Sequence, residues 1–240
     1  MNPQFLLGGE LEVGRLGFGA MRVVEDREEG VRVVRRAVEL GVTLIDTADI
    51  YGAGVSEEVV AEALHPYPEG VVIATKGGLG YGLRERTRDG RPEYLRRACE
   101  ASLRRLRLER IDLYQLHRHD PEVPIEESLG ALEALRVEGK IRMIGVSNVS
   151  LGQLRRAQSV ARIVSVQNEY NRGLLISDDV LDACEAEGIG FMPWRPLGEA
   201  LRGDPVGELR WLLDRSPVIL PIPGTSSVAH LEENMRALDA

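Results

Sequence analysis

The chain switches repeatedly between two patterns of apolar and polar residues. Short apolar runs rich in Val, Ile and Leu alternate with longer segments in which apolar residues recur every three or four positions. The first pattern predicts buried strands, and the second predicts helices with one apolar face. The predicted strands are Leu16–Met21, Leu44–Ala48, Val71–Lys76, Leu113–His117, Met143–Asn148, Val164–Tyr170, Gly190–Trp194 and Ile219–Gly224. The predicted helical stripes lie within residues 31–38, 95–106, 125–135, 151–157, 180–184, 209–213 and 228–238.

Eight strands that alternate with helices predict an α/β fold in which a parallel sheet closes into a (β/α)8 TIM barrel. We expect residues 1–240 to form a single barrel domain, since such barrels occupy roughly 250 residues and no linker interrupts the repeat. The segment Phe5–Gly14, which turns at Gly8-Gly9, predicts an N-terminal β-hairpin. An open doubly wound sheet is the alternative fold. It would carry a motif of three glycines after its first strand, and Gly17-Phe18-Gly19 does not continue to the third.

The composition and charge argue against some classes of partner and some locations of the protein. The formal net charge of −8 argues against nucleic acid or an anionic membrane surface. No apolar run reaches the roughly 18 residues of a membrane span, and Met1–Gln4 does not begin a signal peptide. Cys99 and Cys184 lie in predicted helices without metal-binding spacing, so we expect two buried thiols, with a disulfide as the alternative. We therefore expect a cytoplasmic protein. The sequence leaves its oligomeric state open, and a monomer is favoured.

Four residues with catalytic potential follow three successive strands. Asp46 ends one strand, Tyr51 comes five residues later, Lys76 ends the next strand and His117 ends the third. A tyrosine phenol, with a reference pKa of about 10, needs a neighbouring cation that stabilises the phenolate before it can donate a proton at neutral pH. Lys76 is one of only two lysines among the 30 basic residues. Taken singly, each residue could be a cap, a rim aromatic or a surface charge. Together, at the carboxyl ends of barrel strands, they predict proton transfer to a carbonyl group.

Two neighbouring features leave alternatives open. The long segment Gly77–Gly90 follows the third predicted strand, and it could be a solvated charged loop or a lid over the substrate. His117 and His119 have the spacing of zinc ligands, which makes a metal-dependent barrel hydrolase a second class of function. That class needs further ligands, and the other two histidines, His65 and His230, fall in predicted helices.

Four ordered motifs resemble the aldo-keto reductase family over nearly the whole chain. They are Asp46-Thr47-Ala48-Asp49-Ile50-Tyr51-Gly52, the helix 125–135, the stretch 139–148 that reads GKIRMIGVSN, and Ile222-Pro223-Gly224-Thr225-Ser226-Ser227 followed by His230, Glu233 and Asn234. The resemblance implies reduction of an aldehyde or ketone, with Asp46, Tyr51, Lys76 and His117 as the catalytic tetrad and Tyr51 as general acid. His117 would orient the carbonyl group of a small-molecule substrate.

The resemblance also implies NADPH as the cofactor, with NADH as the alternative. It places Ser147, Asn148 and Gln167 on the nicotinamide carboxamide and Trp194 against the nicotinamide ring, although Trp194 could be a core residue. Thr225 and Ser226 precede a helix whose N–H groups suit a phosphate, and simple capping would give the same geometry. The other implied cofactor residues are Gly19, Met21, Asp46, Arg195, Pro196, Leu197, Gly224, His230, Glu233 and Asn234.

The chain departs from the family pattern at its cofactor-binding end. Only 20 residues separate Gly198 from Ile219, where we expect a loop and a longer helix. Gly224 stands where many members have lysine, and His230 stands where others have arginine. Arg195 and Arg202 are candidate phosphate contacts. These departures leave a non-catalytic, nucleotide-sensing barrel as a further alternative.

Overall fold

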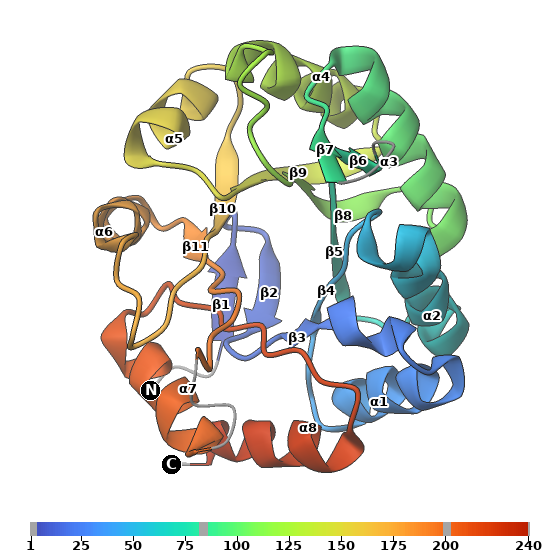
Figure 1. The fold of residues 1–240 in the computed structure, drawn as a ribbon, viewed down its shortest axis with the longest axis vertical. Helices are drawn as coiled ribbons and strands as arrows, with labels where there is room; N and C mark the ends of the chain where they lie inside the picture. The colour runs from blue at the N-terminus through green and yellow to red at the C-terminus, as the bar shows by residue number, and fades with distance from the viewer. Residues whose placement is uncertain (1–3, 82–85, 199–202, 240) are drawn as a thin grey trace.

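The structure, a computed structural model, describes residues 4–81, 86–198 and 203–239. Within these residues seven parallel strands form one curled sheet, in the order β11-β10-β9-β8-β5-β4-β3, and the helices surround it (Figure 1). The strands are β3 (Phe18–Gly19), β4 (Leu44–Asp46), β5 (Val72–Gly77), β8 (Ile111–Leu116), β9 (Ile141–Ser147), β10 (Ile163–Gln167) and β11 (Gly190–Phe191). The α-helices are α1 (Arg27–Glu39), α2 (Val55–Leu64), α3 (Pro92–Leu106), α4 (Ile125–Val137), α5 (Leu151–Gln158), α6 (Asp178–Glu187), α7 (Pro205–Arg215) and α8 (Val228–Met235). Short 3₁₀ helices are η1 (Ala20–Val24), η2 (Tyr51–Gly54) and η4 (Arg236–Leu238).

The eighth position of the barrel is not the regular strand that was expected over Ile219–Gly224. Pro221 and Pro223 lack the N–H group that a strand donates, so only their carbonyl groups take part. The N–H of Gly17 donates to Pro221 O at 2.9 Å, and the N–H of Gly19 donates to Pro223 O at 3.2 Å. On the other side, Ile219 forms a parallel bridge with Phe191. The ring of strands is therefore closed, and the predicted (β/α)8 barrel is confirmed.

The predicted N-terminal hairpin is also confirmed. Strands β1 (Gln4–Leu7) and β2 (Leu11–Gly14) pair antiparallel, and both turn residues, Gly8 and Gly9, have positive φ. Such a backbone favours glycine because it has no Cβ. Leu7 and Val13 belong to the same apolar cluster as residues inside the barrel, so the hairpin covers the barrel's amino-terminal end.

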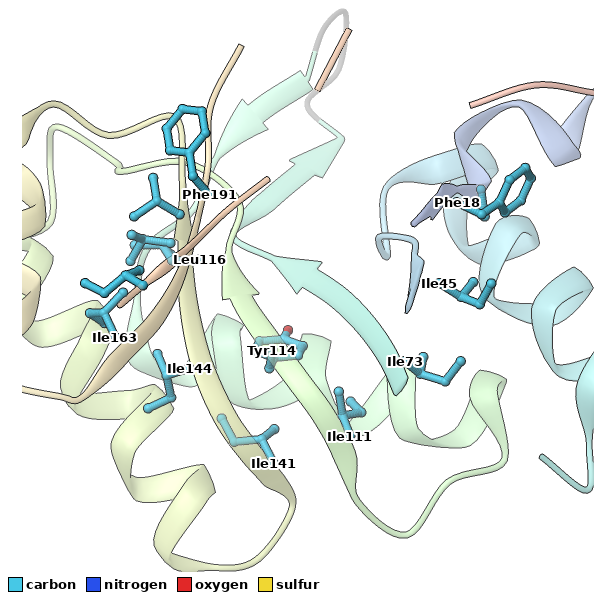
Figure 2. Packing of buried hydrophobic residues seen from close by; sticks show 14 of the residues in the cluster. Phe18, Ile45, Ile73, Ile111, Tyr114, Leu116, Ile141, Ile144, Ile163 and Phe191 are labelled. Atoms are coloured by element: carbon cyan, nitrogen blue, oxygen red, sulfur yellow. The ribbon is translucent and has the colours of Figure 1, made fainter. Parts of the chain in front are cut away.

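Alternate residues of the strands build two separate apolar layers. One set faces the helices, and Figure 2 shows Ile45, Ile73 and Ile144 within it. The other set fills the barrel interior and includes Leu44, Val72, Leu113, Met143 and Val164. The alternation has a period of two, as expected for strands.

Strand β10 breaks this alternation once. Ile163 pairs with Ile144 and Ser165 pairs with Gly145, so β10 carries one extra residue, Val164, at a β-bulge. Val164 joins the apolar interior. Ser165 also points inward, because its side chain contacts Gln115 within the barrel. The bulge thus lets an apolar residue and a polar residue that are adjacent in sequence both face the barrel interior.

The segment Gly77–Gly90 contains a second hairpin instead of an irregular loop. Strands β6 (Leu79–Tyr81) and β7 (Arg86–Arg88) pair antiparallel, and residues 82–85 lie outside the described part. Cys99 and Cys184 are buried free thiols, as predicted. Among the described residues, no helix is long and apolar enough to cross a membrane.

Candidate active site

Asp46, Lys76, Tyr51 and His117 meet at the carboxyl ends of β4, β5 and β8, as the sequence predicted. The Lys76 Nζ donates to Asp46 Oδ2 at 2.7 Å and to Thr47 O at 2.7 Å, and it lies 3.4 Å from Tyr51 Oη. Lys76 is fully buried and the Asp46 side chain is 3% exposed. Burial opposes the charged ammonium, but the charges of Asp46 and Tyr51 outweigh it and raise the pKa of Lys76. Lys76 is therefore held as a cation beside the phenol.

The second oxygen of Asp46 is held by two amides. Gln167 Nε2 donates to Asp46 Oδ1 at 2.9 Å, and Gln115 Nε2 donates to the same atom at 3.4 Å. Ser165 Oγ in turn donates to Gln115 Oε1 at 3.3 Å. All four side chains are buried. This arrangement suits a carboxylate, which accepts hydrogen bonds at both oxygens.

Gln115 was missed by the sequence reasoning. Its signal was present, because a glutamine within the apolar run of β8 shares the inward face of Leu113 and His117. Its partner on the adjacent strand β9 is Gly145. A Cβ at Gly145 would lie 2.1 Å from Ser165 Oγ and 2.9 Å from Gln115 Cγ. Only glycine leaves room for this polar layer above the apolar interior.

The loop after β4 brings Tyr51 back over Lys76. Gly52 and Ala53 both have positive φ within η2, which turns the chain sharply after the tyrosine. The Tyr51 and His117 rings meet edge to face, with centroids 5.9 Å apart and planes at 86°. The Lys76 Nζ also lies 5.0 Å from the centroid of the Tyr51 ring. The phenol oxygen is thus placed between a cation and an imidazole.

A second acid in the same loop, Asp49, is half-buried, with its Oδ1 shielded from solvent. Its Oδ1 has no hydrogen-bond partner among the described residues. Burial, with a smaller contribution from the charge of Glu57, raises the pKa of Asp49 to about 7, although Arg105, Lys76 and the N–H of Ile50 act in the opposite direction. Glu57 itself is held by Arg105 at 2.6 Å and by Thr75 at 2.6 Å. Asp49 was not singled out from the sequence.

A cleft of about 450 Å³ opens beside Tyr51 and His117. Of the residues implied for cofactor binding, those that line it are Gly19, Met21, Asp46, Ser147, Asn148, Gln167, Trp194, Arg195, Pro196, Leu197 and Gly224. Residues that sequence reasoning did not place there are Arg22, Leu79, Arg118, Gly198, Ile222 and Pro223. Gly19 and Gly224 face each other at the closure of the barrel, where a Cβ on Gly224 would lie 2.8 Å from Gly19 O.

The polar residues of the cleft are connected to one another. Asn148 Nδ2 donates to His117 O at 3.1 Å and to Ser147 Oγ at 2.9 Å, while Asn148 Oδ1 accepts from Trp194 Nε1 at 3.1 Å. Ser147 Oγ donates to Gln167 O at 2.8 Å. These bonds fix the Trp194 indole ring and leave lone pairs on Asn148 Oδ1 and Gln167 Oε1 as acceptors. The donor and acceptor set therefore fits a carboxamide such as that of nicotinamide.

The remaining implied cofactor residues lie at α8, outside the cleft lining. Ser227 caps α8 by accepting from the His230 N–H at 3.4 Å, and Thr225 Oγ1 accepts from the Ser227 N–H at 3.0 Å. Ser226 Oγ donates to Glu25 at 3.3 Å. Glu233 is half-buried and Asn234 is buried on the same helix.

The two arginines proposed for phosphate differ in their surroundings. Arg195 has positive φ and forms an ion pair with Glu169 at 2.9 Å. Arg202 lies outside the described residues. Within the described ranges, no group of three histidine, cysteine or acidic side chains could hold a metal ion.

The comparisons with known proteins agree with this geometry. Residues 15–204 match the model of the Aldo/keto reductase family. An uncharacterized oxidoreductase of Schizosaccharomyces pombe is 42% identical over 254 residues, which cover 95% of this chain and 83% of that protein. Pyridoxine 4-dehydrogenase of Escherichia coli is 39% identical over 259 residues, which cover 95% of this chain and 91% of the relative. The crystal structure of an aldo/keto reductase from Klebsiella pneumoniae in complex with NADP and acetate superposes with a TM-score of 0.86 at 29% identity, covering 100% of this chain and 91% of that one. The chain therefore belongs to the aldo/keto reductase family.

Proposed function

We propose that this protein reduces an aldehyde or ketone to an alcohol with NADPH as reductant and Tyr51 as general acid. The observation that carries the proposal is the position of Lys76, buried between the carboxylate of Asp46 and the hydroxyl of Tyr51. A barrel that only sensed a nucleotide would have no need for a buried lysine beside a phenol. The family match supports the same class of reaction.

The residues of the chain perform the acid–base half of the reaction. Bound NADPH supplies the hydride that reduces the carbonyl carbon. Tyr51 donates its hydroxyl proton to the carbonyl oxygen as negative charge develops there. Lys76 stabilises the phenolate that Tyr51 becomes, and the phenolate regains a proton from solvent. His117, whose ring lies against that of Tyr51, is placed to donate a hydrogen bond to the same carbonyl oxygen.

The cleft residues divide into two proposed cofactor contacts. Ser147, Asn148 and Gln167 would hold the carboxamide of nicotinamide, and Trp194 would stack on its ring, since its indole is fixed by Asn148. The glycine pair Gly19 and Gly224 provides space for close approach of the cofactor at the barrel closure. NADP bound to the Klebsiella pneumoniae relative supports NADP over other dinucleotides for this chain. We propose that Thr225, Ser226, His230, Glu233 and Asn234 contact its adenosine end.

Replacement of Tyr51 tests the assignment. Tyr51→Phe keeps the ring against His117 and removes the proton donor, so NADPH should bind with unchanged affinity. The rate of carbonyl reduction should fall at least roughly 10²-fold, the usual contribution of a general acid. Binding is measured by quenching of tryptophan fluorescence and turnover by loss of NADPH absorbance. A variant that reduces aldehydes as fast as the parent enzyme would exclude Tyr51 as the acid.

Reduction should be assayed with a panel of aldehydes and ketones. The panel should include pyridoxal, because the Escherichia coli relative is named for oxidation of the corresponding alcohol.

We also propose that the protein is a cytoplasmic monomer. Its two cysteines are reduced and buried. Among the exposed large apolar side chains of the described residues, only Leu175 and Ile176 are neighbours in sequence, and the others, Leu6, Met21, Val137 and Leu238, come from separate elements. Light scattering after size-exclusion chromatography measures the oligomeric state.

A further inference from the structure

The cleft beside the tetrad carries two arginines that form no ion pair within residues 4–81, 86–198 and 203–239. Arg22 and Arg118 both line it, and neither guanidinium forms a hydrogen bond or ion pair with any residue that the structure describes. Some other arginines are paired, as Arg195 is with Glu169 and Arg156 with Glu126. The chain has 38 acidic residues against 30 basic ones, so acidic partners are abundant.

Arg118 lies closer to the catalytic tetrad in sequence than Arg22 does. It directly follows His117 at the end of β8, so its Cα lies about 3.8 Å from that of His117. Its side chain is half-buried, and a guanidinium that is withdrawn from water without a partner is unfavourable. Arginine presents a planar fork of donors that matches a carboxylate or phosphate. An oxyanion of a bound molecule would supply the missing partner.

The residues around each arginine differ, and they indicate which ligand each arginine would contact. Leu79, from β6, lines the cleft and packs with Ile50 and Tyr51 in one apolar cluster. Arg22 lies on η1, next to the closure formed by Gly19 and Gly224, where the cofactor is proposed to bind. Arg118 follows β8, three strands away from β3 in the sheet, and is adjacent in sequence to the residue that would bind the carbonyl oxygen. The two arginines therefore serve different ligands.

We propose that Arg118 binds an anionic group of the carbonyl substrate. The preferred substrates are then aldehydes or ketones that carry a carboxylate or another oxyanion, joined to the carbonyl by a short apolar or aromatic spacer. This inference rests on the proposed reductase function. It adds the substrate class to it and makes Arg118 the residue that determines specificity.

The test compares an acid with its neutral ester. Wild-type enzyme should reduce 4-carboxybenzaldehyde with a higher kcat/KM than methyl 4-formylbenzoate, and Arg118→Gln should lower the acid-to-ester ratio about tenfold, as expected for loss of one charged hydrogen-bonded pair. Arg118→Lys should recover only part of the ratio, since an ammonium lacks the fork. Arg104→Gln, on the exposed face of α3, is the matched control and should leave the ratio unchanged.

A binding measurement separates this role from catalysis. The alcohol product 4-(hydroxymethyl)benzoate should quench Trp194 fluorescence in wild-type protein, with a Kd about tenfold weaker in Arg118→Gln. Arg22→Gln should weaken binding of NADPH instead. Equal kcat/KM values for acid and ester, unaffected by Arg118→Gln, would overturn the inference while leaving the reductase function intact. Absence of turnover with both aldehydes and with every other carbonyl compound of the panel would refute the reductase function itself.

Discussion

The buried pair Asp46–Lys76 allows stability and catalysis to be separated by mutation. Lys76→Met leaves Asp46 with only the amides of Gln115 and Gln167, and Asp46→Asn leaves Lys76 with only the neutral oxygens of Thr47 and Tyr51. Each single variant thus buries an unpaired charge. The double variant buries none and keeps nearly the same volume.

The magnitude follows from the depth of the pair. Lys76 is 0% exposed and the Asp46 side chain 3%. Removing one partner of such a pair costs about 3–5 kcal/mol, because the remaining charge has lost both water and its counter-charge. For a protein of this size, each 1 kcal/mol lowers Tm by roughly 2–4 °C, so each single variant should melt roughly 6–20 °C below the parent protein. The double variant should be more stable than either single variant.

Urea unfolding followed by tryptophan fluorescence gives the three free energies of unfolding, and NADPH consumption gives the activity of each variant. Lys76→Met and the double variant should lack carbonyl reduction, since neither has a cation beside Tyr51. Asp46→Asn keeps Lys76 beside Tyr51, so it should reduce carbonyls more slowly than the parent protein but faster than the other two variants. Strictly additive destabilisation in the double variant would show that the two charges do not depend on each other. Activity in the double variant would show that the pair has no part in proton transfer.

Three further predictions concern buried groups near the site or the closure of the barrel. Arg15→Met should cost about 3 kcal/mol in urea unfolding, because the buried Arg15 guanidinium donates to the carbonyl oxygens of Leu213, Ser216 and Ile219. Of these oxygens, Ser216 O would keep one donor, the Ile219 N–H. A change below ~1 kcal/mol would contradict this prediction. Asp49→Asn should stabilise the protein at pH 8. The pKa of Asp49 is raised from 3.8 to about 7 on folding, so the folded state favours the protonated carboxyl. The stability of the folded state with Asp49 is therefore fully present below pH 3.8 and falls as the pH rises to about 7, where the carboxyl ionises. The gain should be on the order of 4 kcal/mol above pH 7 and should vanish in urea titrations below pH 3.8; a gain independent of pH would exclude this cause. Gly145→Ala should destabilise the protein by about 1–3 kcal/mol and slow carbonyl reduction, because the new methyl group displaces Ser165 and Gln115. Adding Ser165→Ala should restore part of the stability and part of the rate. No recovery in this double variant would contradict the steric explanation.

The sequence predicted the barrel and the four tetrad positions because both depend on short-range patterns. Each of Asp46, Lys76 and His117 ends an apolar run, and the carboxyl ends of barrel strands face one site. The apolar pattern did not predict two irregularities of the strands. Val164 occupies a β-bulge that no local propensity indicates. Pro221 has no N–H group and contributes only its carbonyl oxygen to the hydrogen bonds that close the barrel.

Other parts of the site depend on contacts between distant strands. Gln115 could be placed on the inward face of its strand, but its contact with Asp46 joins residues 69 positions apart. The sequence also could not show that Arg118 has no ion-pair partner among the described residues, because ion pairs depend on which side chains the fold brings together. Residue type and period therefore predicted the positions of the catalytic groups, and only the three-dimensional structure showed which groups support them.

The closure of the barrel has a consequence for how the protein is made. The contacts that close the ring join Gly17 and Gly19 to Pro221 and Pro223, about 200 residues later in the chain. A ribosome releases the early strands first, at roughly 5–20 residues per second, so β3 must wait as an open edge for at least ten seconds. Gly19 and Gly224, on opposite sides of this closure, both line the cleft. The nascent chain can therefore acquire a complete cleft only once Gly224 has been synthesised, after the helices up to α7.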